Sequence, residues 1–100
     1  MWFLDLIIKE FVSIVQALEQ THPVENNRII LEREDFKGLL EKYGYMSFRA
    51  KTKVYKDLNF IIHDKNNYTM PYKQSGKTVR KVILNYRTYQ TIKSLLEKAD

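Results

Sequence analysis

The first 18 residues are strongly apolar, and this segment constrains the fold more than any other part of the chain. Within residues 1–20, apolar side chains recur at alternating spacings of three and four residues, the period of one helical face. They are Leu4, Ile7, Phe11, Ile14 and Leu18. A second set, Leu6, Ile8, Val12 and Val15, widens this face. A helix this apolar must be covered on most sides, by the rest of the chain, a second copy or another part of a longer protein.

Charged residues exclude a membrane role for the same segment. Asp5, Lys9 and Glu10 interrupt it well short of the ~18 apolar positions that a membrane-spanning helix needs. No basic region precedes it and no small-residue cleavage site follows it, as a signal peptide would require. The chain also lacks cysteine, which fits a reducing compartment. We therefore expect a cytoplasmic protein that does not contact a membrane.

The remaining pattern predicts an α+β fold. A short β-branched run at residues 29–31 is followed by helix-forming residues at 33–43 and 48–58. Ser47 can cap the second of these helices and Asn59 can end it, because Asn tolerates the left-handed conformation. Two strand-like runs follow at residues 68–73 and 78–86, and residues 74–77 between them have the composition of a hairpin loop. A last helix is expected at residues 88–98.

Length and composition indicate one domain over residues 1–100. Apolar residues make up 44% of the 100 residues, which suffices for one hydrophobic core. Pro71 has no amide hydrogen to donate, so the strand that contains it should lie at a sheet edge.

Charge is distributed unevenly between the two halves of the chain. Residues 1–46 hold five Lys and Arg against eight Asp and Glu, a net charge of −3. Residues 47–100 hold twelve against four, a net charge of +8. Clustered cations displace counterions from phosphates and are typical of nucleic-acid binding. A solvated lysine-rich surface is the alternative interpretation.

The cations of the second half gather on two predicted elements. One helix carries Arg49, Lys51, Lys53 and Lys56, with Thr52 among them. The hairpin carries Lys73, Lys77, Arg80 and Lys81. A helix fits the major groove of DNA, and a basic hairpin beside it can contact phosphates. Tyr68 and Tyr72, on one face of the same strand, are candidates for base stacking.

No pattern of catalytic or metal-binding residues emerges. Residues 75–78 (SGKT) look like the end of a phosphate-binding loop, but Pro71 stands where that motif needs its first Gly. The only acid–imidazole group comprises Asp57, His63 and Asp64, without an accompanying Ser motif. Two histidines and no cysteine make a weak metal site. We expect no enzyme activity and no cofactor.

Residues 29–86 resemble winged-helix DNA-binding domains, in which a helix-turn-helix is followed by a β-hairpin wing. Residues 54–61 (VYKDLNFI) are similar to the end of a recognition helix, where a Leu-Gly-Leu-Ile type sequence turns into the wing, with Asn59 at the usual Gly position. Residues 76–80 (GKTVR) are similar to a wing tip and its return strand. The resemblance implies DNA contact by the helix at residues 49–56 and by the wing. The long N-terminal helix is not part of this family pattern.

Winged helices of this kind occur in replication proteins of phages and mobile elements and at the C-terminal ends of some replicative helicases. We therefore predict non-enzymatic DNA binding in replication of a phage or mobile genetic element. The alternatives are a protein-interaction module of a replication complex and a dimeric transcriptional regulator. The predominance of Lys favours phosphate contacts, so replacing Lys51 and Lys53 with Glu should weaken DNA binding without unfolding the protein. The first helix should form an interface with a second copy or a replication partner through Leu4, Ile8, Phe11, Val12 and Val15.

Overall fold

Helix α1 (Trp2–Leu18) packs one face into the hydrophobic core, as its apolar spacing predicts. The computed structural model describes residues 2–98, so residue 1 of the expected 1–20 helix lies outside the described part. The buried apolar side chains of α1 are Ile7, Phe11, Ile14, Val15 and Leu18. Across residues 2–98, no helix combines the length and the apolarity that crossing a membrane would take.

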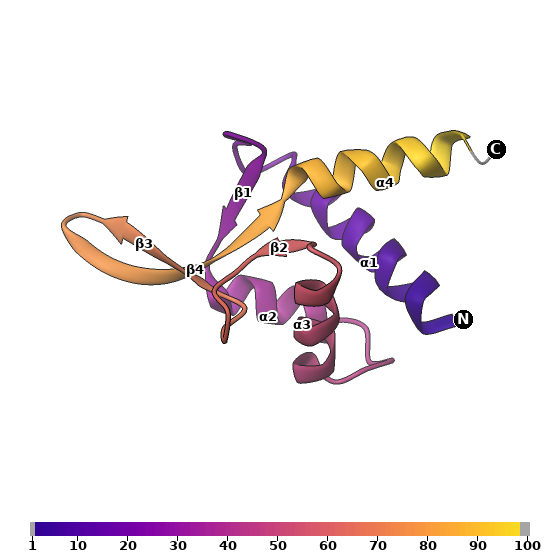
Figure 1. Ribbon diagram of the computed structural model, residues 1–100, viewed down its shortest axis with the longest axis horizontal. Coiled ribbons are helices and arrows are strands. Elements are labelled where there is room, and N and C mark those ends of the chain that lie inside the picture. Colours follow the sequence, from indigo (N-terminus) through magenta and orange to yellow (C-terminus); the bar gives the residue numbers. More distant parts are fainter. Residues whose placement is uncertain (1, 99–100) are drawn as a thin grey trace.

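Within residues 2–98 the chain forms four helices and a small antiparallel sheet, which confirms the α+β expectation (Figure 1). After α1 the elements are β1 (Arg28–Leu31), α2 (Arg33–Glu41), α3 (Phe48–Asp57), β2 (Ile61–Ile62), β3 (Met70–Gln74), β4 (Lys77–Asn85) and α4 (Tyr86–Lys98). Each element expected from the sequence is present, and its ends differ from the expected ones by at most two residues.

Strand β4 organises the sheet because all the other strands pair with it. Its second half lies between β1 and β2, with Leu31 opposite Val82 and Ile61 opposite Leu84. Its first half pairs with β3 alone and projects away from the helices as a hairpin (Figure 1). This projection contributes to an elongated shape, with principal extents of 47 × 27 × 24 Å over Cα atoms.

The hairpin has a two-residue turn at its tip. Ser75 and Gly76 both have positive φ, at 53° and 78°, as a type I′ turn requires. Gln74 and Lys77 therefore face each other as the last pair of the ladder. Strand β3 pairs with β4 and with no other strand in the described residues, which confirms the edge position predicted from Pro71. The phosphate-loop-like SGKT segment is thus a hairpin tip, without the helix that such a loop precedes.

Both ends of α3 follow from local sequence chemistry. The Ser47 side chain accepts a hydrogen bond from the Ala50 amide at 3.1 Å, which caps the N-terminus as predicted. Asn59 has a φ of 59°, which confirms the left-handed residue expected after the helix. The Phe60 amide then donates to the Tyr55 carbonyl at 2.9 Å, and the chain continues into β2.

Aromatic side chains join α1 to α3 in the core. The rings of Phe11 and Phe60 stack at 4.1 Å between centroids, and Tyr55 meets both edge-on. Such pairs add stability beyond simple burial. The exposed face of α3 is therefore held in place by buried contacts on its opposite side.

Candidate nucleic-acid interface

The exposed face of α3 keeps three of its four predicted cations near solvent. Arg49 and Lys53 are exposed, and Lys56 is half-buried. Lys53 lies 3.1 Å from the Asp57 carboxylate, one turn further along the helix. Both side chains of this pair are largely exposed, so the pair is weak and can yield to a phosphate.

A groove runs between α3 and the loop that precedes β3. Its volume is about 700 Å³. Residues that line it are Ser47, Phe48, Arg49, Ala50, Thr52, Lys53, Lys56, Asp57, Asn66, Asn67 and Tyr68. The groove therefore has a mainly cationic wall on α3 and an amide-bearing wall on the loop. Asn66 and Asn67 are absent from the predicted site because their composition indicated only a turn. Their amide side chains, able to donate and accept hydrogen bonds, were the signal that could have found them.

The β3–β4 hairpin keeps two of its four predicted cations free to meet a ligand. Lys73 and Lys77 are exposed on either side of the turn. Tyr72 lies beside Lys73 on β3 and is also exposed, as a stacking residue would need to be. The β3–β4 hairpin that carries these three residues projects away from the helices (Figure 1).

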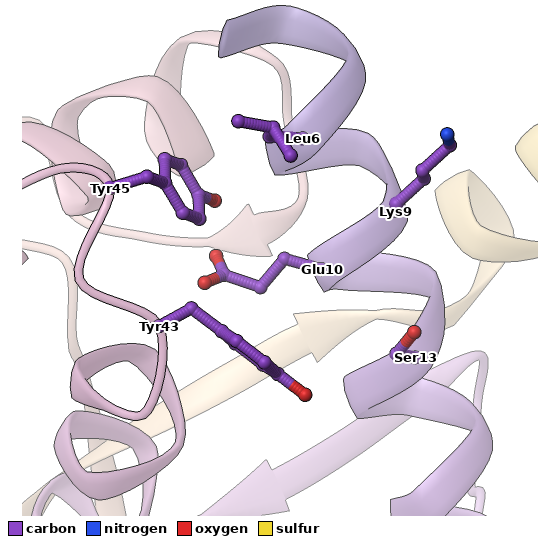
Figure 2. A pocket seen from close by; sticks show the side chains of 6 residues that line it. All are labelled: Leu6, Lys9, Glu10, Ser13, Tyr43 and Tyr45. Carbon is purple, nitrogen blue, oxygen red and sulfur yellow. The ribbon is translucent and has the colours of Figure 1, made fainter. Parts of the chain in front are cut away.

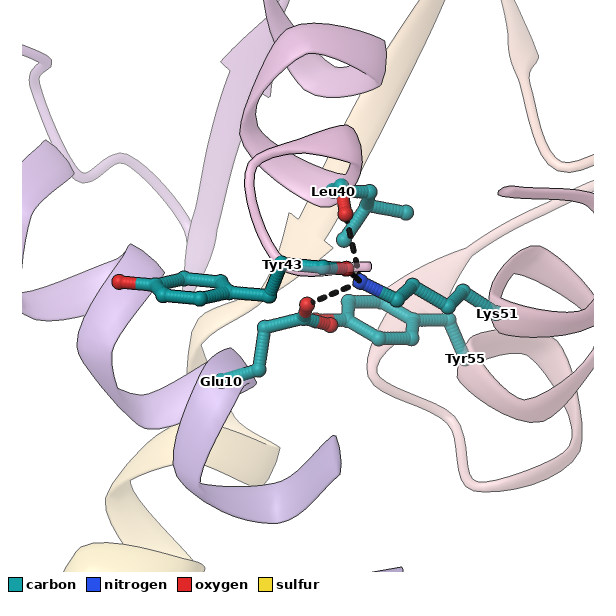
Figure 3. Close-up of polar contacts among 5 residues, drawn as sticks. All are labelled: Glu10, Leu40, Tyr43, Lys51 and Tyr55. Carbon is teal, nitrogen blue, oxygen red and sulfur yellow. Dashed lines mark hydrogen bonds and ion pairs between the residues drawn. The ribbon is translucent and has the colours of Figure 1, made fainter. Parts of the chain in front are cut away.

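Lys51 is a correction to the predicted site. Its side chain is 0% exposed, and its ammonium Nζ donates to Glu10 Oε2 at 2.6 Å and to the carbonyls of Leu40 at 2.5 Å and Tyr43 at 2.6 Å (Figure 3). The other Glu10 oxygen accepts from the Tyr55 hydroxyl at 2.8 Å. A side chain with all three ammonium hydrogens used inside the protein cannot contact phosphate. The expectation that Glu at this position leaves the fold intact assumed an exposed side chain. Because Lys51 is buried, we now expect Glu here to destabilise the fold by adding a second carboxylate beside Glu10.

Three more predicted contacts are engaged within the protein. Thr52 is buried and donates its hydroxyl hydrogen to the Arg49 carbonyl at 2.9 Å. Lys81 is buried and pairs with Glu32. Arg80 is partly exposed and pairs with Asp64. The structure thus removes Lys51, Thr52 and Lys81 from the predicted surface and leaves Arg80 at its margin.

Tyr68 packs as part of the core rather than as a free platform. Its ring stacks on Phe36 with centroids 6.0 Å apart and meets Phe48 edge-on at 5.6 Å. One face of the ring is therefore covered. Because β3 begins at Met70, Tyr68 also does not share a strand face with Tyr72, as the sequence had suggested.

The predicted interface on α1 is only partly exposed. Phe11 and Val15 are fully buried in the core of the chain itself, so they cannot contact a partner. Ile8 and Val12 pack against that core at its edge, and Leu4 is exposed. On α1 and α4, the exposed leucines that were not in the predicted set are Leu6, Leu95 and Leu96.

A smaller pocket of about 180 Å³ lies between α1 and the connection from α2 to α3 (Figure 2). Tyr43 and Tyr45 extend from this connection towards Glu10 of α1. Burial and the Glu10 carboxylate raise the pKa of Tyr45, and they raise that of Tyr55 in the same way. The pocket carboxylate is already paired with Lys51, so this pocket does not extend the cationic surface.

Among residues 2–98, no group of three or more His, Cys, Asp or Glu side chains is arranged to hold a metal ion. The acid–imidazole group seen in the sequence does not form a unit. Asp57 pairs with Lys53, Asp64 pairs with Arg80, and the His63 Nδ1 lies 2.7 Å from the Asp64 carbonyl oxygen. Neither carboxylate is thus paired with the imidazole.

No model of a known protein family matches this chain, and no curated protein shows significant similarity to it.

Proposed function

We propose that the chain is a winged-helix domain that binds DNA without catalysis, through the exposed face of α3 and the β3–β4 wing. The order of elements supports this reading: a helix, a strand, two helices and a hairpin. The sheet order also supports it, because the last strand, β4, lies between β1 and β2, the strand that follows α3. Because proteins of one fold have many functions, the function is inferred from the residues of the site.

The observation that carries the proposal is the segregation of the cations. The structure pairs Lys51, Arg80 and Lys81 with carboxylates. The cations left near solvent on α3 and the wing are Arg49, Lys53, Lys56, Lys73 and Lys77. Two separate elements thus present cations to solvent, while their other cations are paired with carboxylates of the protein. A line of negative charge, such as a phosphate backbone, is the complementary ligand.

The chemistry of these residues suggests mostly phosphate contacts. Lysine binds phosphate as a point charge and reads bases poorly, whereas arginine can form two hydrogen bonds with guanine. Arg49 lies near the N-terminus of α3, the part of a recognition helix that reaches base edges. We infer binding with limited sequence preference, which suits replication of a phage or mobile element better than strict operator recognition.

Titration of a short duplex at several salt concentrations tests the proposal. If all five cations neutralise phosphates, the logarithm of the binding constant should fall against the logarithm of salt with a slope of about −4 to −5. Replacing Lys53 or Lys77 with Met should weaken binding and make that slope shallower by about 1. Lys98→Met removes the same charge from α4, away from the wing, and should change neither quantity by as much.

Absence of binding at low salt would reject DNA as the ligand. Equal effects of the Lys53, Lys77 and Lys98 variants would instead indicate non-specific attraction by net charge. A single-stranded oligonucleotide of the same sequence, titrated in parallel, tells which form of DNA the surface prefers.

A protein-interaction module is a second candidate, favoured by exposed apolar side chains on α1 and α4. They are Leu4, Leu6, Leu95 and Leu96. Apolar surface of this kind often marks an interface. Sedimentation at micromolar concentration tests self-association: a dimer that becomes a monomer on changing Leu95 and Leu96 to Lys would support this candidate, in the form of a dimeric regulator or a replication module.

A further inference from the structure

Arg80 connects β4 to the loop between β2 and β3. Its Nη2 donates to the Asp64 carboxylate and to the Thr69 carbonyl, the latter at 2.9 Å. Its Nε donates to the Thr69 hydroxyl at 2.7 Å. Three of the five guanidinium N–H groups are therefore used within the protein, and the side chain is only 35% exposed. We call these contacts of Asp64, Thr69 and Arg80 the clasp.

Backbone contacts alone hold this loop weakly. The Asp64 amide donates to the Thr69 carbonyl at 3.4 Å, and the Asn67 amide donates to the Asp64 carbonyl at the same distance. Both distances exceed those of ordinary N–H···O hydrogen bonds. The β3–β4 ladder begins only at Met70, and its second pair contains Pro71, which has no amide hydrogen. The clasp therefore replaces ladder hydrogen bonds that this part of the chain lacks.

The loop held by the clasp forms one wall of the α3 groove. Asn66 and Asn67 lie between Asp64 and Thr69, and Arg80 joins these two residues by contacting both. On the opposite wall are Arg49 and Lys53 of α3. The loop wall of the groove, which carries both amides, is thus tied to β4 by the contacts of Arg80.

We propose that Arg80 is a positioning residue, which orders the loop at residues 64–69 so that Asn66 and Asn67 can contact DNA bound along α3. This inference rests on the proposed function, and it reverses the role that the sequence suggested for Arg80. Asn side chains can pair with adenine or donate to phosphate oxygens, so an ordered loop would add contacts that the cations cannot make. Arg80 then raises affinity without touching DNA.

Two conservative variants separate positioning from direct contact because the two roles predict different directions of change. Arg80→Lys keeps the charge but loses the planar fork that reaches Asp64 and Thr69 together. Asp64→Asn removes a negative charge beside the interface. If Arg80 contacted phosphate directly, the first variant would bind nearly as well as the wild type and the second would bind more tightly. If Arg80 positions the loop, both variants should bind more weakly.

The size of the expected loss follows from the population of the ordered loop. If either variant leaves the loop ordered about a tenth of the time, the apparent Kd should rise by at most about tenfold, because the exposed cations still contact DNA when the loop is disordered. The salt dependence should stay at the wild-type slope, because no phosphate contact by Arg80 has been removed. Lys77→Met, a wing change outside the clasp, should instead make the slope shallower.

A double-mutant cycle tests the connection through the loop. In a chain with Asn66 and Asn67 both changed to Ala, Asp64→Asn should cause little further loss of affinity, because the contacts that the clasp orders are already absent. Additive losses would overturn the proposal, as would tighter DNA binding by Asp64→Asn or unchanged binding by Arg80→Lys.

Amide hydrogen exchange of the free protein provides a reading that does not depend on DNA. Amides of residues 64–69 should exchange faster in both variants, whereas those of α1 and α3 should keep wild-type rates. Unchanged exchange in the loop would overturn the clasp even if DNA bound. Faster loop exchange in both variants would show that the clasp orders the loop, whether or not the protein binds DNA. If the protein binds no DNA, the proposed function is rejected, and with it the role of Arg80 in positioning DNA contacts.

Discussion

Lys51 and Lys53 lie two positions apart on α3 and have opposite environments. The Lys51 ammonium is enclosed by one carboxylate and two carbonyls, and it also lies 4.2 Å from the centre of the Tyr45 ring. The Lys53 ammonium faces solvent beside Asp57. Two positions along a helix turn the side chain by more than half a revolution. The identity of a residue therefore says less about its role here than the helical face on which it lies.

Lys51→Met should destabilise the protein by about 3–5 kcal/mol, because it leaves the Glu10 carboxylate buried without its cation. Lys53→Met, the matched change on the exposed face, should alter the free energy of unfolding by less than about 0.5 kcal/mol. Urea denaturation followed by circular dichroism measures both values.

The double variant with Met at both Glu10 and Lys51 is the control for this prediction. Since replacing both partners removes the uncompensated charge, it should regain most of the stability lost in the single variant. A Lys51→Met protein as stable as the wild type would show that Glu10 does not depend on this cation.

At the scale of elements, α3 is a short helix whose position depends on both of its ends. Ser47 caps the first turn, and Asn59 reverses the chain so that Phe60 can stack on Phe11 of α1. A left-handed residue is needed at this point because β2 must turn back to pair with β4. The turn at the end of α3 thus places both β2 in the sheet and Phe60 in the aromatic core.

Asn59→Ala should cost at most about 1–2 kcal/mol, because Ala lacks the short polar side chain whose local hydrogen bonding lets Asn adopt the left-handed conformation. Asn59→Gly should retain wild-type stability or exceed it slightly, because Gly adopts this conformation without strain. Thermal unfolding of both variants makes the comparison. If the two were equally stable, the positive φ would not be what Asn59 contributes.

At the scale of the whole molecule, one carboxylate joins the first helix to the last. Glu19, just after α1, accepts hydrogen bonds from the Tyr86 hydroxyl at 2.5 Å and the Tyr89 hydroxyl at 3.0 Å, both on α4. The hydrogen bond to Glu19, together with burial, raises the pKa of Tyr86 from 10.0 to about 12. The same carboxylate and burial also raise the pKa of Tyr89.

These shifts predict a loss of stability in alkaline solution. The folded protein retains the Tyr86 proton above the pH at which the unfolded chain releases it, so this contribution is complete below about pH 10. It should decline as the pH rises towards about 12, because the folded state then loses its advantage. Urea midpoints over this interval should fall for the wild type and fall less for Tyr86→Phe.

Tyr72→Phe, which changes an exposed tyrosine of the β3–β4 hairpin, is the control for the alkaline experiment. Its midpoints should follow the wild-type curve. An equal decline in the Tyr86→Phe protein would show that other groups account for the alkaline sensitivity.

The sequence by itself determined the features that depend on neighbouring residues. The apolar spacing of α1, the Ser47 cap, the left-handed Asn59 and the edge strand containing Pro71 were all predicted and confirmed. Each depends on the conformational preference or hydrogen-bonding capacity of a residue within a few positions of its partner. The gathering of cations on one helix and one hairpin was visible for the same reason.

Only the tertiary structure decided which of those cations remain available to a ligand. Lys51 meets Glu10 across 41 positions, Lys81 meets Glu32 across 49, and Arg80 meets Asp64 across 16. No local pattern relates these residues, because the folded chain brings them together. Burial then makes pairing necessary for Glu10, Lys51 and Lys81. The loop amides of Asn66 and Asn67 reach the α3 groove in the same way. The sequence thus supplied the charges, whereas long-range packing divided them between the interior and the surface.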